Sequence, residues 1–228
     1  MRDHKDWRAD LLDRLGPYCC YCNIRLPESP QVEHVTAQVL ASGQALDWDN
    51  LLLACGACNS RKNALPCTPT THFLPHAHNT HLAFAYQTIP HPVQPGKLAA
   101  VVVVRPGLSA AQHTKALATI ELCQLANIPT DNRRLAQAID LRWKYRQEEL
   151  LEAGLYRNHW DAVDATGQQL LLDSIERLAR KGGFFSVWFA AFHDVPAVKQ
   201  ALLAAFPGTA ACFPAPAYDP VERISGDL

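Results

Sequence analysis

Apolar and polar residues recur with different periods along the chain, and the change of period separates a mixed first half from a helical second half. Residues 3–15 carry an apolar stripe at helical spacing, and Gly16 followed by proline ends the helix that they predict. The alternation over residues 82–86 favours a strand. The valine-rich run over residues 97–105 predicts a second strand, which is buried.

From residue 109 onward the apolar spacing is that of helices. Capping boxes, and in one case a proline in the first turn, predict helix starts at Ser109, Thr166 and Asp194. A longer helix is predicted over residues 130–153, stopped by Gly154. Aromatic residues at helical spacing predict core packing, with a partner-binding patch as the alternative. They are Phe184, Phe185, Trp188, Phe189 and Phe192.

These boundaries divide the chain into five segments. They are an N-terminal helix (1–16), a cysteine-rich segment (17–63), a connector rich in proline and histidine with strands (64–108), a helical region (109–206) and a proline-rich C-terminal tail (207–228). The connector histidines are predicted to lie in a solvated loop, with metal binding as the alternative. They are His72, His76, His78, His81 and His91.

Four of the eight cysteines form two C-x-x-C pairs, Cys19/Cys22 and Cys55/Cys58. Each pair can turn two thiolates toward one ion, and four sulfur ligands are typical of tetrahedral Zn²⁺. Because four protein ligands leave no open position, the predicted zinc is structural. Cys20 is an alternative to Cys19, although its spacing is poorer. The other thiols are predicted to be buried, namely Cys67, Cys123 and Cys212.

The residues around these pairs form an ordered series of motifs. An E-H dipeptide at residues 33–34 lies on a short predicted strand, D-N-L-L-L-A precedes the second pair from residue 49, and N-S-R-K occupies residues 59–62. This series resembles the HNH endonuclease family. The resemblance implies a ββα-metal fold, in which two strands and a helix hold one divalent ion. The expected fold class is therefore α+β, with this core followed by a mainly α-helical C-terminal region.

The resemblance also assigns roles by position. His34 takes the place of the general base that deprotonates the attacking water, and an imidazole titrates near neutral pH. Glu33 and Asn59 take the places of the protein ligands of the catalytic ion, Mg²⁺ or Mn²⁺. Asn50 matches the asparagine that holds the histidine-bearing loop. The family usually has aspartate at the first ligand position and often histidine at the second. Glu33 is longer than aspartate by one methylene, and the neutral amide of Asn59 is a weaker ligand, so the metal is expected to be reached differently and held less tightly.

The charge balance limits how this chain can bind nucleic acid. It has 21 Lys and Arg residues against 22 Asp and Glu, and residues 1–62 contain seven basic and eight acidic side chains. No basic half is therefore hidden in the total. A balanced protein lacks a general attraction for phosphate backbones, so binding requires a local patch or a partner. Arg61 and Lys62 are predicted to supply local contacts with substrate phosphates.

A second basic group lies on the predicted long helix and comprises Arg133, Arg134, Arg142, Lys144 and Arg146. It suits a stripe that contacts a nucleic-acid backbone. Glutamates at positions 148, 149 and 152 follow at once, so a solvated face with ion pairs is favoured. The longest apolar run, residues 98–104, is too short to cross a bilayer, and the N-terminus lacks a secretory signal. A soluble, cytoplasmic protein is expected.

A looser resemblance concerns residues 48–51, 119–125, 133–135, 206–209 and 212–213. They are similar to PtuB-like HNH nucleases of the Septu and retron anti-phage defence systems. An ABC- or SMC-like ATPase is the usual partner in that group, which implies that the ATPase recruits nucleic acid, expected to be DNA, for this subunit to cut. Two alternatives stay open: a non-catalytic zinc module that binds nucleic acid or protein, and a stand-alone restriction or homing nuclease.

Overall fold

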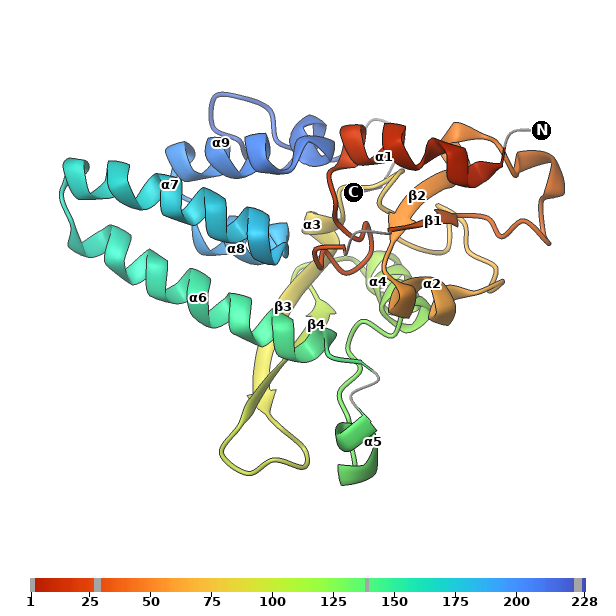
Figure 1. The fold of residues 1–228 in the computed structure, drawn as a ribbon, viewed down its shortest axis with the longest axis horizontal. Helices are drawn as coiled ribbons and strands as arrows, with labels where there is room; N and C mark the ends of the chain where they lie inside the picture. Colours follow the sequence, from red (N-terminus) through yellow and green to blue (C-terminus); the bar gives the residue numbers. More distant parts are fainter. Residues whose placement is uncertain (1–2, 27–29, 138–139, 224–226) are drawn as a thin grey trace.

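The computed structural model describes residues 3–26, 30–137, 140–223 and 227–228. Its helices and small sheets give the predicted α+β class. The cysteine-rich segment and the N-terminal helix lie at one end, a layer of helices lies at the other, and a β-hairpin lies between them (Figure 1). Among the described residues, no helix is both long enough and apolar enough to cross a bilayer.

The N-terminal helix begins with a 3₁₀ turn, His4–Trp7, and continues as α1, Arg8–Leu15. Gly16 ends it, as predicted, with a φ of +78°. This left-handed conformation favours glycine, and an added Cβ would lie 2.9 Å from the ring of Tyr18. The chain therefore turns sharply into the first cysteine pair.

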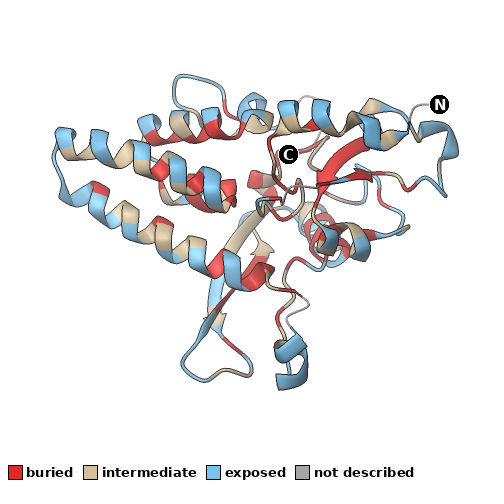
Figure 2. Cartoon of the chain, in the orientation of Figure 1, coloured by how far each residue is buried: buried red, intermediate tan, exposed pale blue. Residues whose placement is uncertain are grey.

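The cysteine-rich segment forms a two-stranded sheet followed by a short helix. Its elements are β1 (Gln31–His34), β2 (Leu51–Ala54) and α2 (Gly56–Lys62), with 3₁₀ turns at Ser42–Gln44 and Trp48–Asn50 between the strands. The strands are antiparallel and place His34 opposite Leu51. All four residues of β2 are buried (Figure 2), which explains the run of leucines in this strand.

The connector contains a second hairpin flanked by helices. Its elements are α3 (Thr80–Ala83), β3 (Phe84–Pro90), β4 (Leu98–Val104) and α4 (Ala110–Leu122). Strand β4 and the capping box at Ser109 are confirmed. Strand β3 begins at Phe84 rather than at residue 82, because the preceding residues belong to α3. The prediction of solvated histidines is wrong for His78, His81 and His91, which are buried.

The C-terminal region is helical as predicted, and α6–α9 form what we call the helical layer. The elements are α5 (Asn132–Gln137), α6 (Arg142–Ala162), α7 (Ala165–Gly182), α8 (Phe185–Ala191), α9 (Pro196–Ala205) and a 3₁₀ turn, Pro207–Cys212. The phenylalanines and tryptophan predicted for the core are buried in this layer. Their aromatic packing therefore belongs to the interior and not to a partner-binding patch.

The single helix predicted over residues 130–153 is wrong. Helix α5 ends at residue 137, residues 138–139 lie outside the described part, and α6 begins after Asp140, whose carboxylate accepts a hydrogen bond from the backbone N–H of Arg142. Helix α6 continues through Gly154, which does not stop it. A glycine inside a helix costs only about 1 kcal/mol relative to alanine, and burial of one face of α6 outweighs that cost.

The helix start predicted at Thr166 is also wrong. Helix α7 begins one residue earlier, and its N-cap is Asp164, whose carboxylate accepts from the backbone N–H of Gly167 at 2.9 Å. Helix α9 does begin at Pro196, but Asp194 pairs with Arg157 and does not cap it. The first difference is local, because Asp164 caps the helix three residues before Gly167, whereas Asp194 finds a partner that local spacing does not reveal.

The basic residues of this region form neither a single stripe, which was the alternative, nor the one solvated face that the sequence favours, although Lys144 does pair with Glu148 at 3.8 Å. Arg142 and Arg146 are buried, and Arg146 donates to the carbonyl of Ala100 on β4 at 3.0 Å. Arg133 and Lys144 are exposed, on helices separated by a break. The basic residues of this region therefore split into buried structural cations and scattered surface charges.

Two sets of contacts join segments that are far apart in the sequence. Gly183, with a φ of +86°, forms a β-bridge with Ile24, and the N–H of Phe184 donates to the carbonyl of Asn23 at 2.6 Å. A Cβ at Gly183 would lie 2.5 Å from that carbonyl oxygen, so glycine is required. The described part of the tail is anchored too, because Asp227 accepts from Lys115 at 2.6 Å.

Candidate active site and zinc centre

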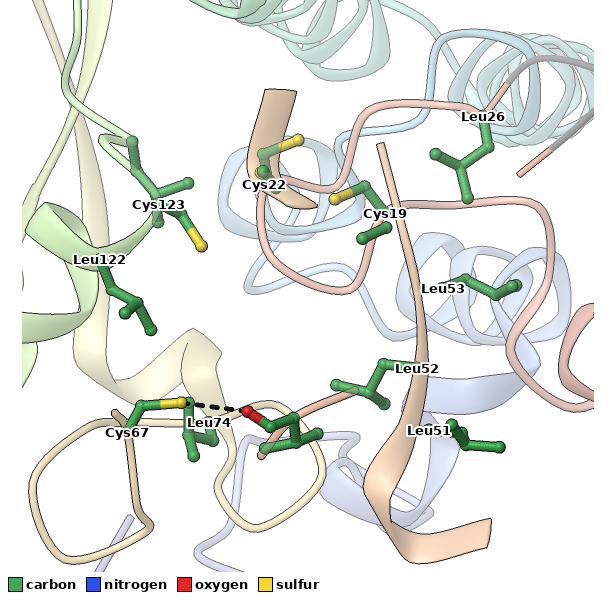
Figure 3. Packing of buried hydrophobic residues seen from close by; sticks show 14 of the residues in the cluster. Cys19, Cys22, Leu26, Leu51, Leu52, Leu53, Cys67, Leu74, Leu122 and Cys123 are labelled. Carbon is green, nitrogen blue, oxygen red and sulfur yellow. Dashed lines mark hydrogen bonds between the residues drawn. The ribbon is translucent and has the colours of Figure 1, made fainter. Parts of the chain in front are cut away.

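The four predicted cysteine ligands converge on one point. The Sγ atoms of the two pairs all lie within 4.8 Å of one another, and those of Cys22 and Cys55 are 3.7 Å apart. Figure 3 shows the sulfurs of Cys19 and Cys22 turned toward each other. The set fits a structural zinc ion, which would bind four thiolates and tie the first pair to α2. Cys58, on α2, completes the group.

Local backbone structure brings each pair into place. In the first pair, Asn23 adopts a φ of +62° and closes a tight turn in which the N–H of Cys19 donates to the carbonyl of Ile24 at 2.9 Å. In the second pair, Cys55 is the N-cap of α2, and its sulfur accepts from the N–H of Cys58 at 3.4 Å. Cys ligands at such turns are typical of zinc knuckles.

Cys20 lies outside the four-sulfur group, which settles the choice at the first pair in favour of Cys19. Burial raises the pKa of the Cys20 thiol to about 12, so that it stays protonated. Its backbone N–H pairs with the carbonyl of Leu53 on β2. The three thiols without an assigned role are buried as predicted, namely Cys67, Cys123 and Cys212.

A buried cation that the sequence did not reveal contacts the zinc centre. One N–H of Arg142 donates to the sulfur of Cys58 at 3.0 Å and to the carbonyl of Cys123 at the same distance. The guanidinium also pairs with Asp140 at 2.9 Å. Four thiolates around one zinc leave a net negative charge, which a buried arginine offsets. Arg142 therefore links α6 to the metal centre.

His34 ends β1, and its imidazole is oriented by a backbone carbonyl. Nε2 lies 2.9 Å from the carbonyl oxygen of Ala45. Because a carbonyl oxygen only accepts, Nε2 carries the proton and Nδ1 keeps its lone pair. The side chain is half-buried, so the ring remains accessible. This tautomer presents a free basic nitrogen, which a general base needs.

Asn50 holds the loop that contributes this carbonyl. Its Oδ1 accepts from the N–H of Thr36 at 2.7 Å, and its Nδ2 donates to the carbonyls of Thr36 and Gln44 at 3.0 and 3.3 Å. Asn50 is buried, and Gln44 directly precedes Ala45. The amide thus joins both ends of the loop after β1. These contacts are those of a loop-holding asparagine, and they act on His34 through Ala45.

Glu33 lies in a different environment from the one that a metal ligand needs. The residue is 3% exposed, with Oε1 2.5 Å from Nζ of Lys62 and Oε2 accepting from the hydroxyl of Tyr21 at 2.7 Å. Burial raises the pKa of the Glu33 carboxyl, although the bonds with Lys62 and Tyr21 oppose that shift. Both oxygens are engaged in the interior, so the arrangement does not fit a divalent ion at Glu33.

The prediction that Lys62 contacts substrate phosphates is wrong. Its side chain has no exposed surface, and Nζ also donates to the carbonyl of His34 at 2.8 Å. Arg61 is engaged as well, because it pairs with Asp140 at 3.1 Å and donates to the side chain of Gln124 at 3.0 Å. Neither residue is presented to a phosphate in this structure. Lys62 is instead part of the scaffold beneath β1.

Asn59, on α2, is partly exposed, and its Nδ2 donates to Oε1 of Gln31 at the start of β1 at 2.9 Å. This contact orients its amide oxygen away from Gln31. Among the described residues, the four cysteines are the only group of three or more Cys, His, Asp or Glu side chains placed to hold a metal. Asn59 alone is a weak donor set for a hard cation.

Sequence reasoning missed His4, whose ring centroid lies 4.7 Å from that of His34. Nδ1 of His4 pairs with Asp3 at 2.7 Å. Burial and the charge of His34 lower the pKa of His4, while Asp3 opposes the shift. No motif marks this residue, because the contact joins the N-terminal turn to the end of β1. The contact between Tyr21 and Glu33 was easier to anticipate from the sequence, because Tyr21 lies between the two cysteines of the first pair.

Comparison with protein families agrees with this site. Residues 19–65 match the family model described as HNH endonuclease, and this stretch is hereafter the HNH segment. The match includes both cysteine pairs, both strands and α2. Comparisons with curated proteins and with solved structures gave no significant match. None of them supports the looser resemblance to PtuB-like nucleases.

Proposed function

We propose that the HNH segment hydrolyses phosphodiester bonds of nucleic acid, with His34 as the general base. The observation that carries this proposal is the hydrogen bond between His34 and Ala45, in a loop held by Asn50. It leaves Nδ1 of His34 free to accept a proton from water. The hydroxide then attacks phosphorus, the P–O bond to the leaving oxygen breaks, and solvent returns a proton to that oxygen.

A cleavage assay tests this proposal. Zinc-loaded protein is incubated with plasmid and with single-stranded DNA or RNA, beside His34→Ala and a matched control, His113→Ala, whose side chain is exposed on α4. Removing a general base typically lowers the rate about 10²- to 10⁴-fold, so only His34→Ala should lose activity. Equal binding by all proteins with no cleavage under any condition would favour the non-catalytic zinc module instead.

The requirement for Mg²⁺ or Mn²⁺ is a separate proposal, supported by the family match alone. For Glu33 to bind such an ion, its carboxylate has to exchange Lys62 for the metal. Assays with either ion and with a brief EDTA treatment, combined with measurement of bound zinc, separate loss of a catalytic ion from loss of the structural one. Activity that persists in EDTA with zinc retained would show that Glu33 is structural only.

We also propose that this protein acts in the cytoplasm as the nuclease subunit of an anti-phage system, recruited to DNA by an ABC- or SMC-like ATPase. The charge balance supports recruitment by a partner, and so do the internal ion pairs of Arg61 and Lys62. Reduced cysteines suit a cytoplasmic zinc site. Co-purification with an ATPase from a neighbouring gene, and DNA cutting only in its presence, is expected. Efficient cutting by the isolated chain at physiological salt would exclude this arrangement.

A further inference from the structure

A cavity of about 570 Å³ lies where α1, the first cysteine turn, the connector and the C-terminal residues meet. Ligand sites in proteins commonly have volumes of roughly 300–1,000 Å³. The residues of the candidate active site, His34 and Asn59, do not line this cavity. It is therefore a separate feature, which the proposed cleavage reaction does not use.

Five aromatic rings form part of the apolar wall of the cavity, beside leucines, prolines and cysteines. The rings are Tyr18, Trp48, Phe185, Phe206 and Phe213. The centroids of Tyr18 and Phe206 are 4.3 Å apart, and those of Phe185 and Phe213 are 5.5 Å apart. Because the tyrosine and the three phenylalanines are buried against one another, the positions of these rings are fixed before any ligand arrives. Aromatic walls of this kind favour flat heterocycles, such as nucleobases.

The charged part of the lining favours an anion. Arg223 donates through one nitrogen to the carbonyls of Pro75 and His76, at 2.7 and 2.9 Å, and pairs with no carboxylate in the described part of the chain. Its other N–H groups have no hydrogen-bond partner among the described residues. Arg14 also lines the cavity and is exposed, and Asp49 is the sole acidic residue among the described residues of the lining. A guanidinium held by carbonyls with free donors is suited to phosphate.

A buried histidine adds a neutral polar group. His81 lines the cavity and is 9% exposed, and its Nδ1 lacks a hydrogen-bond partner within the described residues. Its ring packs edge-on against Phe189 and Phe213. Burial lowers the pKa of His81 to about 3, so the ring is uncharged at physiological pH. A neutral imidazole among aromatic rings can hydrogen-bond a heterocycle without repelling it.

We propose that this cavity binds a nucleoside 5′-phosphate group, with the base against the aromatic wall and the phosphate at Arg223 and Arg14. A free nucleotide and the 5′-phosphorylated end of a strand share this chemistry. The proposal does not depend on cleavage, because none of these residues belongs to the active site.

Isothermal titration of the zinc-loaded full chain tests the proposal. The probes are the four deoxynucleoside 5′-monophosphates, the four deoxynucleosides, inorganic phosphate and a 5′-phosphorylated trinucleotide. At least one monophosphate or the trinucleotide should bind with a 1:1 ratio, at least tenfold more tightly than the nucleoside or phosphate alone. Tighter binding of the trinucleotide identifies a strand end as the source, and tighter binding of the monophosphate identifies a free nucleotide.

Two variants locate the binding. Arg223→Gln should weaken binding at least tenfold, and Arg14→Gln, whose exposed position leaves folding intact, should weaken it several-fold. Arg133→Gln on α5 is the matched control and should bind as the unaltered chain does. Absence of binding at millimolar nucleotide overturns the proposal. Equal affinity of Arg14→Gln and Arg133→Gln for the nucleotide also overturns it, even where Arg223→Gln fails to fold.

Discussion

The HNH segment and the helical layer lie at opposite ends of the molecule and are held together differently (Figure 1). The HNH segment has two four-residue strands and one short helix, and its core includes the zinc-site thiols and leucines of β2. The helical layer has four helices around a core of phenylalanines and tryptophans. Metal ligands and buried polar contacts stabilise the HNH segment, whereas burial of apolar side chains stabilises the helical layer.

The largest expected effect comes from removing the zinc centre. Cys58→Ser should abolish zinc binding and unfold the HNH segment, because a structural zinc contributes roughly 10 kcal/mol to local folding. The helical layer should keep its secondary structure. Zinc content, far-UV circular dichroism and limited proteolysis measure these outcomes. Cys67→Ser, at a buried thiol outside the group, is the control and should retain zinc.

The reverse change weakens the other end. Trp188 is fully buried in the helical layer, and its Nε1 donates to Glu149 at 2.7 Å. Trp188→Ala should lower the free energy of unfolding by about 3–5 kcal/mol while zinc stays bound. Leu170→Ala, at a side chain that is 73% exposed, should change it by less than about 0.5 kcal/mol. Loss of zinc in Trp188→Ala would show that the two ends do not respond separately.

Arg142 joins the two ends, so its removal should affect both. Arg142→Gln deletes the N–H bond to Cys58 and leaves the buried Asp140 with Arg61 as its remaining charged partner among the described residues. We expect the free energy of unfolding, measured in urea, to fall by about 2–3 kcal/mol. Zinc should also be released faster to a chelator. Lys144→Gln, at an exposed site on the same helix, is the control. Unchanged zinc release in Arg142→Gln would contradict the proposed electrostatic contact.

The smallest effect tests burial of one charge in the helical layer. Burial raises the pKa of Glu149 to about 7, while its bond with Trp188 opposes the shift. The folded state then binds more protons than the unfolded state between about pH 4.5 and 7, so stability falls as pH rises through this window. Glu149→Gln should raise the free energy of unfolding by about 1–2 kcal/mol at pH 8, allowing for solvent screening, and should leave it unchanged at pH 4.5. Urea unfolding at both pH values measures this change. An equal increase in the free energy of unfolding at both pH values would contradict the link between stability and the pKa of Glu149.

The HNH segment was more predictable from the sequence than the contacts around it. The spacing of Cys19, Cys22, Cys55 and Cys58 is a local property, because each pair occupies one turn. The helical spacing of the aromatic residues also predicted the core of the helical layer. These features depend on residues close together in the chain, which a single sequence displays.

The failures involve charges whose partners lie far away in the sequence. Lys62 looks like a surface residue until Glu33 is found beside it, and Arg142 looks like part of a basic stripe until Cys58 is found to accept from it. At the break before α6, Asp140 likewise pairs with Arg61 from another segment, in addition to its local bonds with Arg142. Spacing carries no information about such pairs, since only folding brings them together.

The bridge between Gly183 and Ile24 bears on how this domain could be transplanted. A fragment ending near residue 65 would keep every zinc ligand, yet it would lose the N–H of Phe184 that satisfies Asn23 and the guanidinium beside Cys58. The zinc turn would then expose a carbonyl and an uncompensated thiolate. We therefore expect the isolated HNH segment to hold zinc less tightly than the full chain does, and a chimera that borrows it should also carry α6 and the residues just before α8.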